Sequence, residues 1–340
     1  MNNVTAKSLG GNHTIFVAGC IAVILAAIAL IAGVNGDYVF NASFVVLQFV
    51  VLASAWNILG GYAGYVNFGT SAFFALGGYT AVFMIKAFNA PLLLQIIAAA
   101  FVTGLLGLGI GLISLRLRGI FFSIGTVAVA IILETVILNS DYLGGAKGLQ
   151  MLRPEPMAPF ASYDKMLFFV MILMAITTVA IGRYIENSWI GRGLRAIKDN
   201  EEAAECAGVP TLKLKLIATV VSGALMGAAG APLVMYMRFI EPVSAFSLNY
   251  SVSALAMPII GGTSSWIGPI IGSLLLGSVQ QIVTVTISSE LNVMIVGVLL
   301  VFFVVVAPDG ILGLVRKLRD KQNDKRRAAA AAASAGGAAK

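Results

Sequence analysis

Long apolar runs, separated by short polar segments, dominate this chain. At about 20 residues each, such runs are long enough to cross the hydrocarbon core of a bilayer as helices. Ten runs qualify: 15–34, 38–58, 68–86, 91–114, 119–138, 166–185, 214–237, 246–262, 266–287 and 290–307. The pattern predicts an all-α polytopic membrane protein of about ten transmembrane helices. The first run exceeds the apolar core of a signal peptide, so we expect it to be retained.

Composition agrees with this prediction and excludes other classes. The 340 residues are 59% hydrophobic and only 11% charged, whereas soluble domains carry about 25% charged residues. The net charge of +7 lies in short basic runs between the apolar segments, which argues against nucleic-acid binding. Cys20 and Cys206 support no disulfide framework. The spans hold no cluster of metal ligands or paired carboxylates, so we predict no metal site and disfavour a membrane enzyme.

Basic residues predict the orientation of the chain, because cytoplasmic segments carry an excess of lysine and arginine. Segments 192–215 and 316–327 are the richest in both residues, and four predicted spans separate them. Both therefore fall on the cytoplasmic side, and counting back places the N-terminus there too. The predicted organisation is a leader (1–14), a transmembrane domain (15–315) with a cytoplasmic loop (186–213), and a basic, low-complexity tail (316–340). The tail would also attract anionic lipid.

One stretch, GYAGYVNFGTSAFFALGGY (61–79), is too rich in glycine for an ordinary membrane helix and too apolar for an ordinary loop. Glycine clusters allow helices to approach closely. They also permit a broken helix, which is tolerated only when it is buried in protein or faces a water-filled path. In transporters, discontinuous helices often line the substrate site.

A second stretch resembles the first. NFGTSAFFALGG (67–78) and NYSVSALAMPIIGG (249–262) share an Asn-aromatic start, a Ser-Ala pair and a Gly-Gly end. They fall in the third and eighth predicted spans, which run in opposite directions. The match suggests an inverted repeat of five plus five spans. The alternative is that both are simply close-packed helices.

The polar segment RAIKDNEEAAECAGVP (195–210) predicts a short helix outside the membrane. Asp199 followed by Glu202 fits a capping box, and Gly208 and Pro210 fit a helix end. About two turns of helix are marginal in water, so the helix needs something to pack on. Its partner could be another protein or this protein's own surface.

Several strings resemble a known family. EEAAECAG (201–208) is similar to the EAA loop of ABC-importer permeases, although the usual distal Ile-x-Leu-Pro is absent. The string GRGLRAIKDNEEAAECAGV (191–209), with GGTSSWIGPIIGSLLLG (261–277) and APDGILGL (307–314), resembles branched-chain amino acid permeases of the LivM type. The resemblance covers about residues 40–315. The chain departs from the usual family pattern at 66–70 and at Ala146 and Lys147, which leaves the cargo open.

The resemblance implies a permease subunit in the cytoplasmic (inner) membrane of a bacterium. A second related permease, two cytoplasmic ABC ATPases and a soluble extracytoplasmic binding protein would be its partners. ATP and Mg²⁺ would bind the ATPases, and this chain would bind no cofactor and catalyse no reaction. The residues expected to couple to the ATPases are Gly191, Arg195, Glu201, Glu202, Ala203, Ala204 and Gly208. Those expected along the translocation path are Asn57, Asn67, Phe68, Thr70, Ser71, Asn249 and Ser253.

Two alternatives remain at the level of the sequence. A related ABC permease could carry urea, amides, a sugar or a nucleoside instead of an aliphatic amino acid. An ion-coupled secondary transporter could act alone, although the spans lack the chain of ionisable residues that a proton relay uses. Identifying stoichiometric partners would separate the second alternative from the importer.

Overall fold

The computed structural model describes residues 3–33, 36–114, 119–151, 160, 162–286, 289–307, 310–314, 317 and 319. Within these residues, nine helices are long and apolar enough to cross a membrane. The protein is therefore an all-α polytopic membrane protein, as predicted. The predicted tenth span corresponds to α13 (Ser289–Val306). Its described apolar part, Met294–Phe303, is shorter than a membrane span, so α13 is not among the nine. Most of the predicted tail lies outside the described residues.

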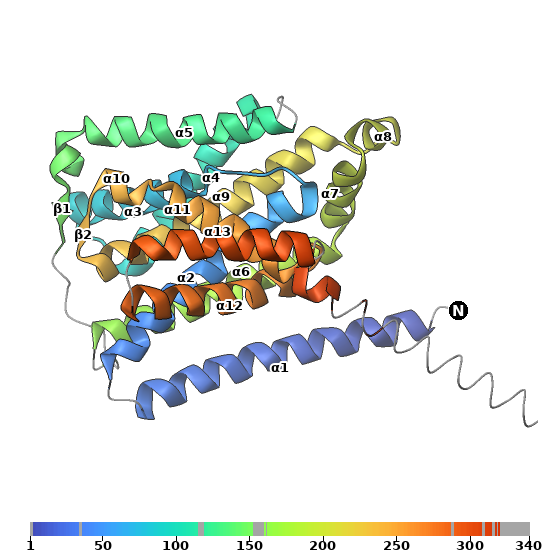
Figure 1. Cartoon of the computed structure of the whole chain (residues 1–340), viewed down its shortest axis with the longest axis horizontal. Helices are drawn as coiled ribbons and strands as arrows, with labels where there is room; N and C mark the ends of the chain where they lie inside the picture. Colours follow the sequence, from blue (N-terminus) through green and yellow to red (C-terminus); the bar gives the residue numbers. More distant parts are fainter. Residues whose placement is uncertain are drawn as a thin grey trace, which may run out of the picture.

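The elements follow one another as a series of long helices with short connecting pieces (Figure 1). In order they are α1 (Asn3–Gly33), α2 (Asp37–Trp56), η1 (Asn57–Gly61), α3 (Thr70–Phe88), α4 (Leu92–Ser114), α5 (Ile120–Leu138), η2 (Asp141–Leu143), η3 (Gly145–Lys147), β1 (Leu149–Gln150), α6 (Tyr163–Asn187), α7 (Trp189–Asp199), α8 (Glu201–Cys206), α9 (Thr211–Met237), β2 (Phe239–Ile240), α10 (Pro242–Ala245), α11 (Leu248–Gly261), α12 (Ile267–Thr286) and α13.

The two ends of the helix bundle carry different structures. The start of α1 and the α7–α8 pair lie at one end, at the right of Figure 1, and β1 and β2 lie at the other. There β1 and β2 form an antiparallel pair, in which Leu149 is opposite Ile240. The start of α1 and the α7–α8 pair lie at the same end, as the predicted topology requires, because six spans separate them. Which end faces the cytoplasm stays a prediction.

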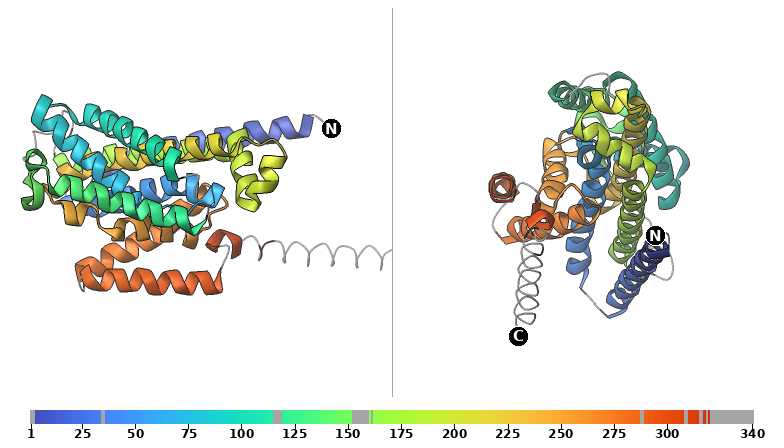
Figure 2. Two further views of the ribbon diagram at one scale, coloured as in Figure 1. Left: turned by 90° about the horizontal axis from the view of Figure 1, so that it is seen from above. Right: turned by 90° about the vertical axis from the view of Figure 1, so that its right-hand side faces the viewer.

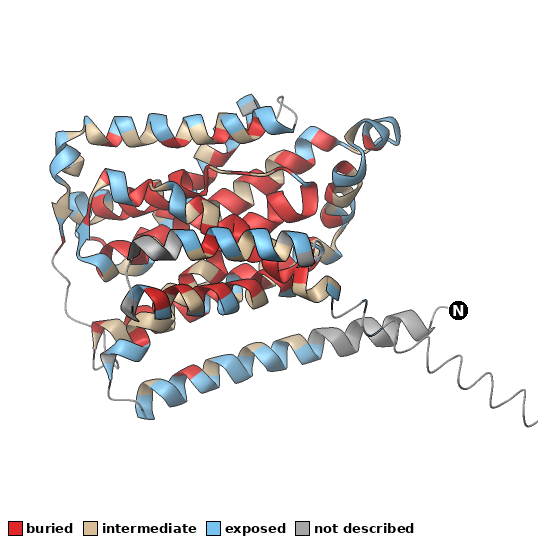
Figure 3. Cartoon of the chain, in the orientation of Figure 1, coloured by how far each residue is buried: buried red, intermediate tan, exposed pale blue. Residues whose placement is uncertain are grey.

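Helix α9 packs closely against α3 and α4. A Cβ atom placed on Gly77 of α3 would lie 2.0 Å from the carbonyl oxygen of Gly227 in α9. Only glycine allows this approach, which is how small residues join helices in lipid. Buried residues fill the middle of the bundle, whereas α1 runs along its outside (Figures 2 and 3). Only 6% of the α1 span is buried.

The glycine-rich stretch 61–79 is an interrupted helix, one of the two structures that its glycines allowed. From α2 the chain passes through a π-helical turn, η1, and two further helical residues, 62 and 63. Residues 64–69 then leave the helical conformation, and α3 begins at Thr70 rather than at the predicted residue 68. We call residues 64–69 the break segment. Tyr65, Asn67 and Gly69 are buried and Gly64 is exposed, so the irregular backbone lies against protein rather than free in lipid along half of its residues.

The predicted inverted repeat pairs α3 with α11. With helices alternating in direction along the chain, α3 and α11 run in opposite directions, as the repeat requires. They differ in length, since α3 has 19 residues and α11 has 14. The repeat itself stays a hypothesis.

Candidate functional site

The break segment is held to α5 by two hydrogen bonds. Ser123 Oγ donates to the carbonyl oxygen of Val66 at 2.8 Å, and the Phe68 N–H donates to Thr126 Oγ1 at 3.1 Å. Both α5 side chains lie one helical turn apart. They supply to the break segment the hydrogen bonds that a continuous helix would have made internally.

Asn67 stabilises the break from within. Its Oδ1 accepts the Gly69 N–H at 2.7 Å, a side-chain turn that asparagine favours. Its carbonyl oxygen accepts Trp56 Nε1–H at 2.8 Å. Asn67 was predicted to line the translocation path, and the structure adds a local role in setting the backbone of the break segment.

The start of α3 meets α11 inside the bundle. The Ser71 N–H donates to Ser251 Oγ at 3.0 Å, and Ser251 Oγ–H donates to Ser71 Oγ at 3.2 Å. Both serines are fully buried. The first N–H groups of a helix have no partner within that helix, and Ser251 supplies one from the opposing helix. Thr70, beside them, is also buried, and within the described residues its Oγ1 has no partner.

Further buried polar groups lie in the spans around α11. Gln280 Nε2 of α12 donates to Ser253 Oγ at 3.2 Å. In the part of the chain that the structure describes, Gln48 Nε2, Ser54 Oγ and Gln280 Oε1 are buried without a hydrogen-bond partner. Such atoms are costly unless water or a solute binds them. They are uncharged, so they could bind a polar solute without fixing it strongly.

Two predicted path residues are placed differently from this buried group. Asn57 is 1% exposed and opens the π-turn η1, where its side chain lies against Gly61. Asn249 is exposed in the first turn of α11, where its N–H donates to Ser247 Oγ at 3.3 Å. The structure therefore gathers Asn67, Thr70 and Ser71 near one point but leaves Asn249 outside it.

The predicted cytoplasmic loop forms two helices, α7 and α8. Ser188 caps α7 and Asn200 caps α8, where Asn200 Oδ1 accepts the Ala203 N–H at 3.0 Å. The predicted cap at Asp199 is therefore wrong by one residue, because Asp199 is the last residue of α7. Gly208 has φ +82°, the left-handed conformation expected after a helix end.

The predicted coupling residues divide into supporting and exposed positions. Gly191 is buried, and a Cβ there would lie 2.2 Å from the carbonyl oxygen of Ile185. Arg195 Nη2 donates to the carbonyl oxygen of Glu186 at 3.0 Å. These two residues hold α7 on the end of α6. Ala204 packs inward, and of the predicted coupling residues Glu202, Ala203 and Gly208 are exposed.

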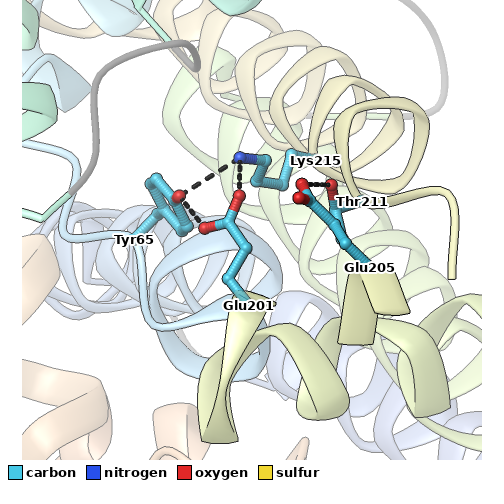
Figure 4. A network of polar contacts seen from close by, with 5 residues as sticks. All are labelled: Tyr65, Glu201, Glu205, Thr211 and Lys215. Carbon is cyan, nitrogen blue, oxygen red and sulfur yellow. Dashed lines mark hydrogen bonds and ion pairs between the residues drawn. The ribbon is translucent and has the colours of Figure 1, made fainter. Parts of the chain in front are cut away.

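The α7–α8 pair also contacts the break segment (Figure 4). The hydroxyl of Tyr65 donates to Glu201 Oε2, and Lys215 Nζ of α9 donates to Glu201 Oε1 at 2.6 Å. Lys198 Nζ of α7 donates to the carbonyl oxygen of Gly61 at 2.9 Å. Burial lowers the pKa of the Lys198 ammonium, and the neighbouring Asp199 partly opposes the shift.

Tyr65, Lys198 and Lys215 were missing from the predicted site. Lys215 could have been found from the sequence, because it is the second residue of the predicted span 214–237 and a charge inside a membrane span implies a partner. No sequence pattern indicated that Tyr65 bonds to Glu201, because 136 residues separate the two.

Comparison with known proteins identifies the family. Residues 38–304 match the family described as the permease component of the branched-chain amino acid transport system. The chain belongs to this family.

Individual relatives agree. The high-affinity branched-chain amino acid permease LivM of Salmonella typhimurium is 24% identical over 79% of this chain and 68% of its own length. LivM of Escherichia coli matches to the same extent. The probable LivH permease of Methanocaldococcus jannaschii is 28% identical over 73% of this chain and 83% of its own length. No solved structure matches the chain.

Proposed function

We propose that this chain is the transmembrane permease subunit of an ATP-driven ABC importer for branched-chain aliphatic amino acids. The observation that carries the proposal is the α7–α8 pair at one end of the bundle, in a chain of the branched-chain amino acid permease family. The pair exposes one side of α8 and contacts the break segment with the other. This arrangement suits a helix that docks on an ATPase.

The length of α8 supports docking on a partner. Its six residues form less than two turns, which is marginal without packing. Ala204 and the Glu201 and Glu205 side chains attach α8 to this protein, while Glu202 and Ala203 stay exposed. Small and acidic side chains on the exposed side would fit a groove with basic groups on the partner.

The translocation path would pass along the break segment and the start of α3. Residues Asn67, Thr70 and Ser71 offer hydrogen bonds without charge, and Phe68 adds an apolar surface. An aliphatic amino acid has a small apolar side chain, so a largely apolar path suits it. Weak contacts along the path leave the choice of cargo to a binding protein.

The proposed assembly contains this chain, a second related permease and two cytoplasmic ABC ATPases in the inner membrane. The ATPases would bind ATP and Mg²⁺, and a soluble extracytoplasmic protein would deliver the cargo. Its landing surface would include the predicted outer loop 139–165, in which η2, η3 and β1 are ordered elements. Residues 152–159 of that loop lie outside the described residues.

The decisive experiment is a mild affinity purification of this chain from its native membrane, followed by mass spectrometry of stoichiometric partners. Recovery of a second permease and an ATPase in equal amounts would support the importer. Vesicles containing the purified complex should then take up radiolabelled L-leucine only with ATP and the binding protein. Uptake by the chain alone, driven by an ion gradient, would replace the proposal with a secondary transporter.

A different cargo has one observation in its favour. The L-arabinose permease AraH of Escherichia coli is 34% identical over 30% of this chain and 33% of its own length. A sugar importer is therefore the second candidate. Competition of leucine uptake by a panel of amino acids, amides and sugars would decide between the two cargo classes.

A further inference from the structure

We infer that Tyr65, Glu201 and Lys215 form a positioning link that makes the break segment follow the movement of α8. The inference rests on the proposed function, because it assigns to α8 the task of transmitting the state of the ATPases. None of the three residues touches the cargo in this scheme. They act by fixing the place of the path-lining backbone relative to the docking helix.

The geometry of the link is a closed triangle (Figure 4). Glu201 Oε1 accepts from Lys215 Nζ at 2.6 Å, Glu201 Oε2 accepts from the Tyr65 hydroxyl, and Lys215 Nζ donates to the Tyr65 hydroxyl oxygen at 3.1 Å. Each side chain comes from a different element: α8, the break segment and α9. Because every pair is bonded, α8 can move without breaking a bond of the triangle only if Tyr65 and Lys215 move with it.

Burial makes these bonds hard to exchange for water. Lys215 is 3% exposed and Glu201 is 15% exposed. Breaking a buried ion pair leaves an uncompensated charge in a poorly solvated place, which is far more costly than breaking a surface pair. Lys215 Nζ also lies 4.8 Å from the centre of the Tyr65 ring. The link therefore moves as a unit more readily than it opens.

The break segment passes the movement onward. The Tyr65 ring meets the fully buried ring of Phe122 in α5 edge to face, at 5.2 Å between centroids. One residue further on, Val66 is bonded to Ser123 of the same helix. A displacement of Tyr65 thus reaches both the path-lining backbone and α5.

A second bond between α8 and α9 provides a matched control. Thr211 Oγ1 of α9 donates to Glu205 Oε1 at 2.7 Å, on the same short helix but without reaching the break segment. The variant Tyr65→Phe removes one hydroxyl from the link and keeps the ring contacts with Phe122. The variant Thr211→Val removes one hydroxyl from the control bond and keeps the side-chain shape.

The experiment measures ATP hydrolysed per L-leucine transported by the complete complex in proteoliposomes. For Tyr65→Phe we expect this ratio to rise about fivefold, the lower end of a typical allosteric coupling. Assembly with the ATPases should be unchanged, because the exposed side of α8 is untouched. For Thr211→Val we expect the same ratio of ATP hydrolysed to leucine transported as for the unaltered protein. A purely structural role for Tyr65 would lower both activities together and leave the ratio unchanged.

The variant Glu201→Gln completes a double-mutant cycle with Tyr65→Phe. If both act through one bond, the double variant should have a ratio no higher than the worse single variant. If the two single variants raise the ratio of ATP hydrolysed to leucine transported by factors that multiply in the double variant, the link is overturned. It is also overturned if, in an active complex, Tyr65→Phe gives the same ratio as Thr211→Val. Loss of assembly in Tyr65→Phe but not in Thr211→Val would also overturn it. If the unaltered complex shows no ATP-dependent uptake of amino acids or sugars, the proposed function fails first.

Discussion

The contact of α3 with α9 gives a prediction whose sign can be derived from the structure. The perturbation is Gly77→Ala. The added Cβ would lie 2.0 Å from the Gly227 carbonyl oxygen, although real Cβ contacts essentially never fall under 3.0 Å. The obstacle is helix backbone and not the end of a flexible side chain. The two helices must therefore separate by about 1 Å or distort.

The expected cost follows from two opposing effects. Overpacking of a well-packed site costs about 1–3 kcal/mol, and the backbone obstacle places this site near 3 kcal/mol. Replacing a helical glycine by alanine gains about 0.5–1 kcal/mol, because the unfolded chain loses less freedom. The net result is a destabilisation of about 2 kcal/mol.

Gly109 of α4 is the matched control. A Cβ there would meet nothing within 4 Å, so Gly109→Ala should keep only the favourable effect. The two variants carry the same chemical change in two transmembrane helices of one protein. Their unfolding free energies should differ by about 3 kcal/mol.

The assay is reversible unfolding by SDS in mixed micelles. Unfolding is monitored by the fluorescence of the three native tryptophans. Each variant is compared with the unaltered protein at the same lipid-to-detergent ratio. Equal stability of Gly77→Ala and Gly109→Ala would refute the close approach of α3 and α9, and with it the explanation for the glycines of α3.

Three further predictions concern the α3–α11 contact, the cap of α8 and the break segment. Ser251→Ala should destabilise the protein more than Ser71→Ala in the same unfolding assay, by about 1 kcal/mol, because only the former leaves the buried Ser71 N–H without an acceptor. Asn200→Ala should cost about 1 kcal/mol locally and speed hydrogen exchange of the Ala203 amide, whereas Asn200→Asp should not. Asn67→Leu should reduce leucine uptake while the complex still assembles, and normal uptake would remove Asn67 from the path.

Much of the architecture could be predicted from periodicity and composition. Apolar runs of membrane length fix the helices, because the backbone in lipid must satisfy its own hydrogen bonds. The glycine density of 61–79 indicated close packing or an interruption, and the structure shows the interruption at 64–69. The exact break could not be predicted, because it depends on Ser123 and Thr126 of α5 supplying bonds to Val66 and Phe68. Those partners are more than 50 residues away.

Helices α7 and α8 show a different limit of prediction from sequence. Helix α7 was not predicted, although Ser188 is a good cap and Leu194 and Ile197 recur at a helical spacing on its buried side. Residues 186–213 were predicted as a loop with a single short helix. Asp199 and Asn200 are both good cap residues, and the sequence alone favoured Asp199 through its spacing from Glu202. The structure ends α7 at Asp199, which leaves Asn200 as the cap.

The position of the break relative to its attachments explains why it is suited to movement. Helices transmit displacement rigidly, whereas residues 64–69 can change backbone angles without breaking a helical ladder. One end of the segment is bonded to α8 through Tyr65, and just beyond the other end Ser71 is bonded to α11. Proximity alone does not make a path of transmission; an element with two arrangements is required. In the break such a change would break bonds to side chains, such as those of Ser123 and Thr126, rather than a helical ladder.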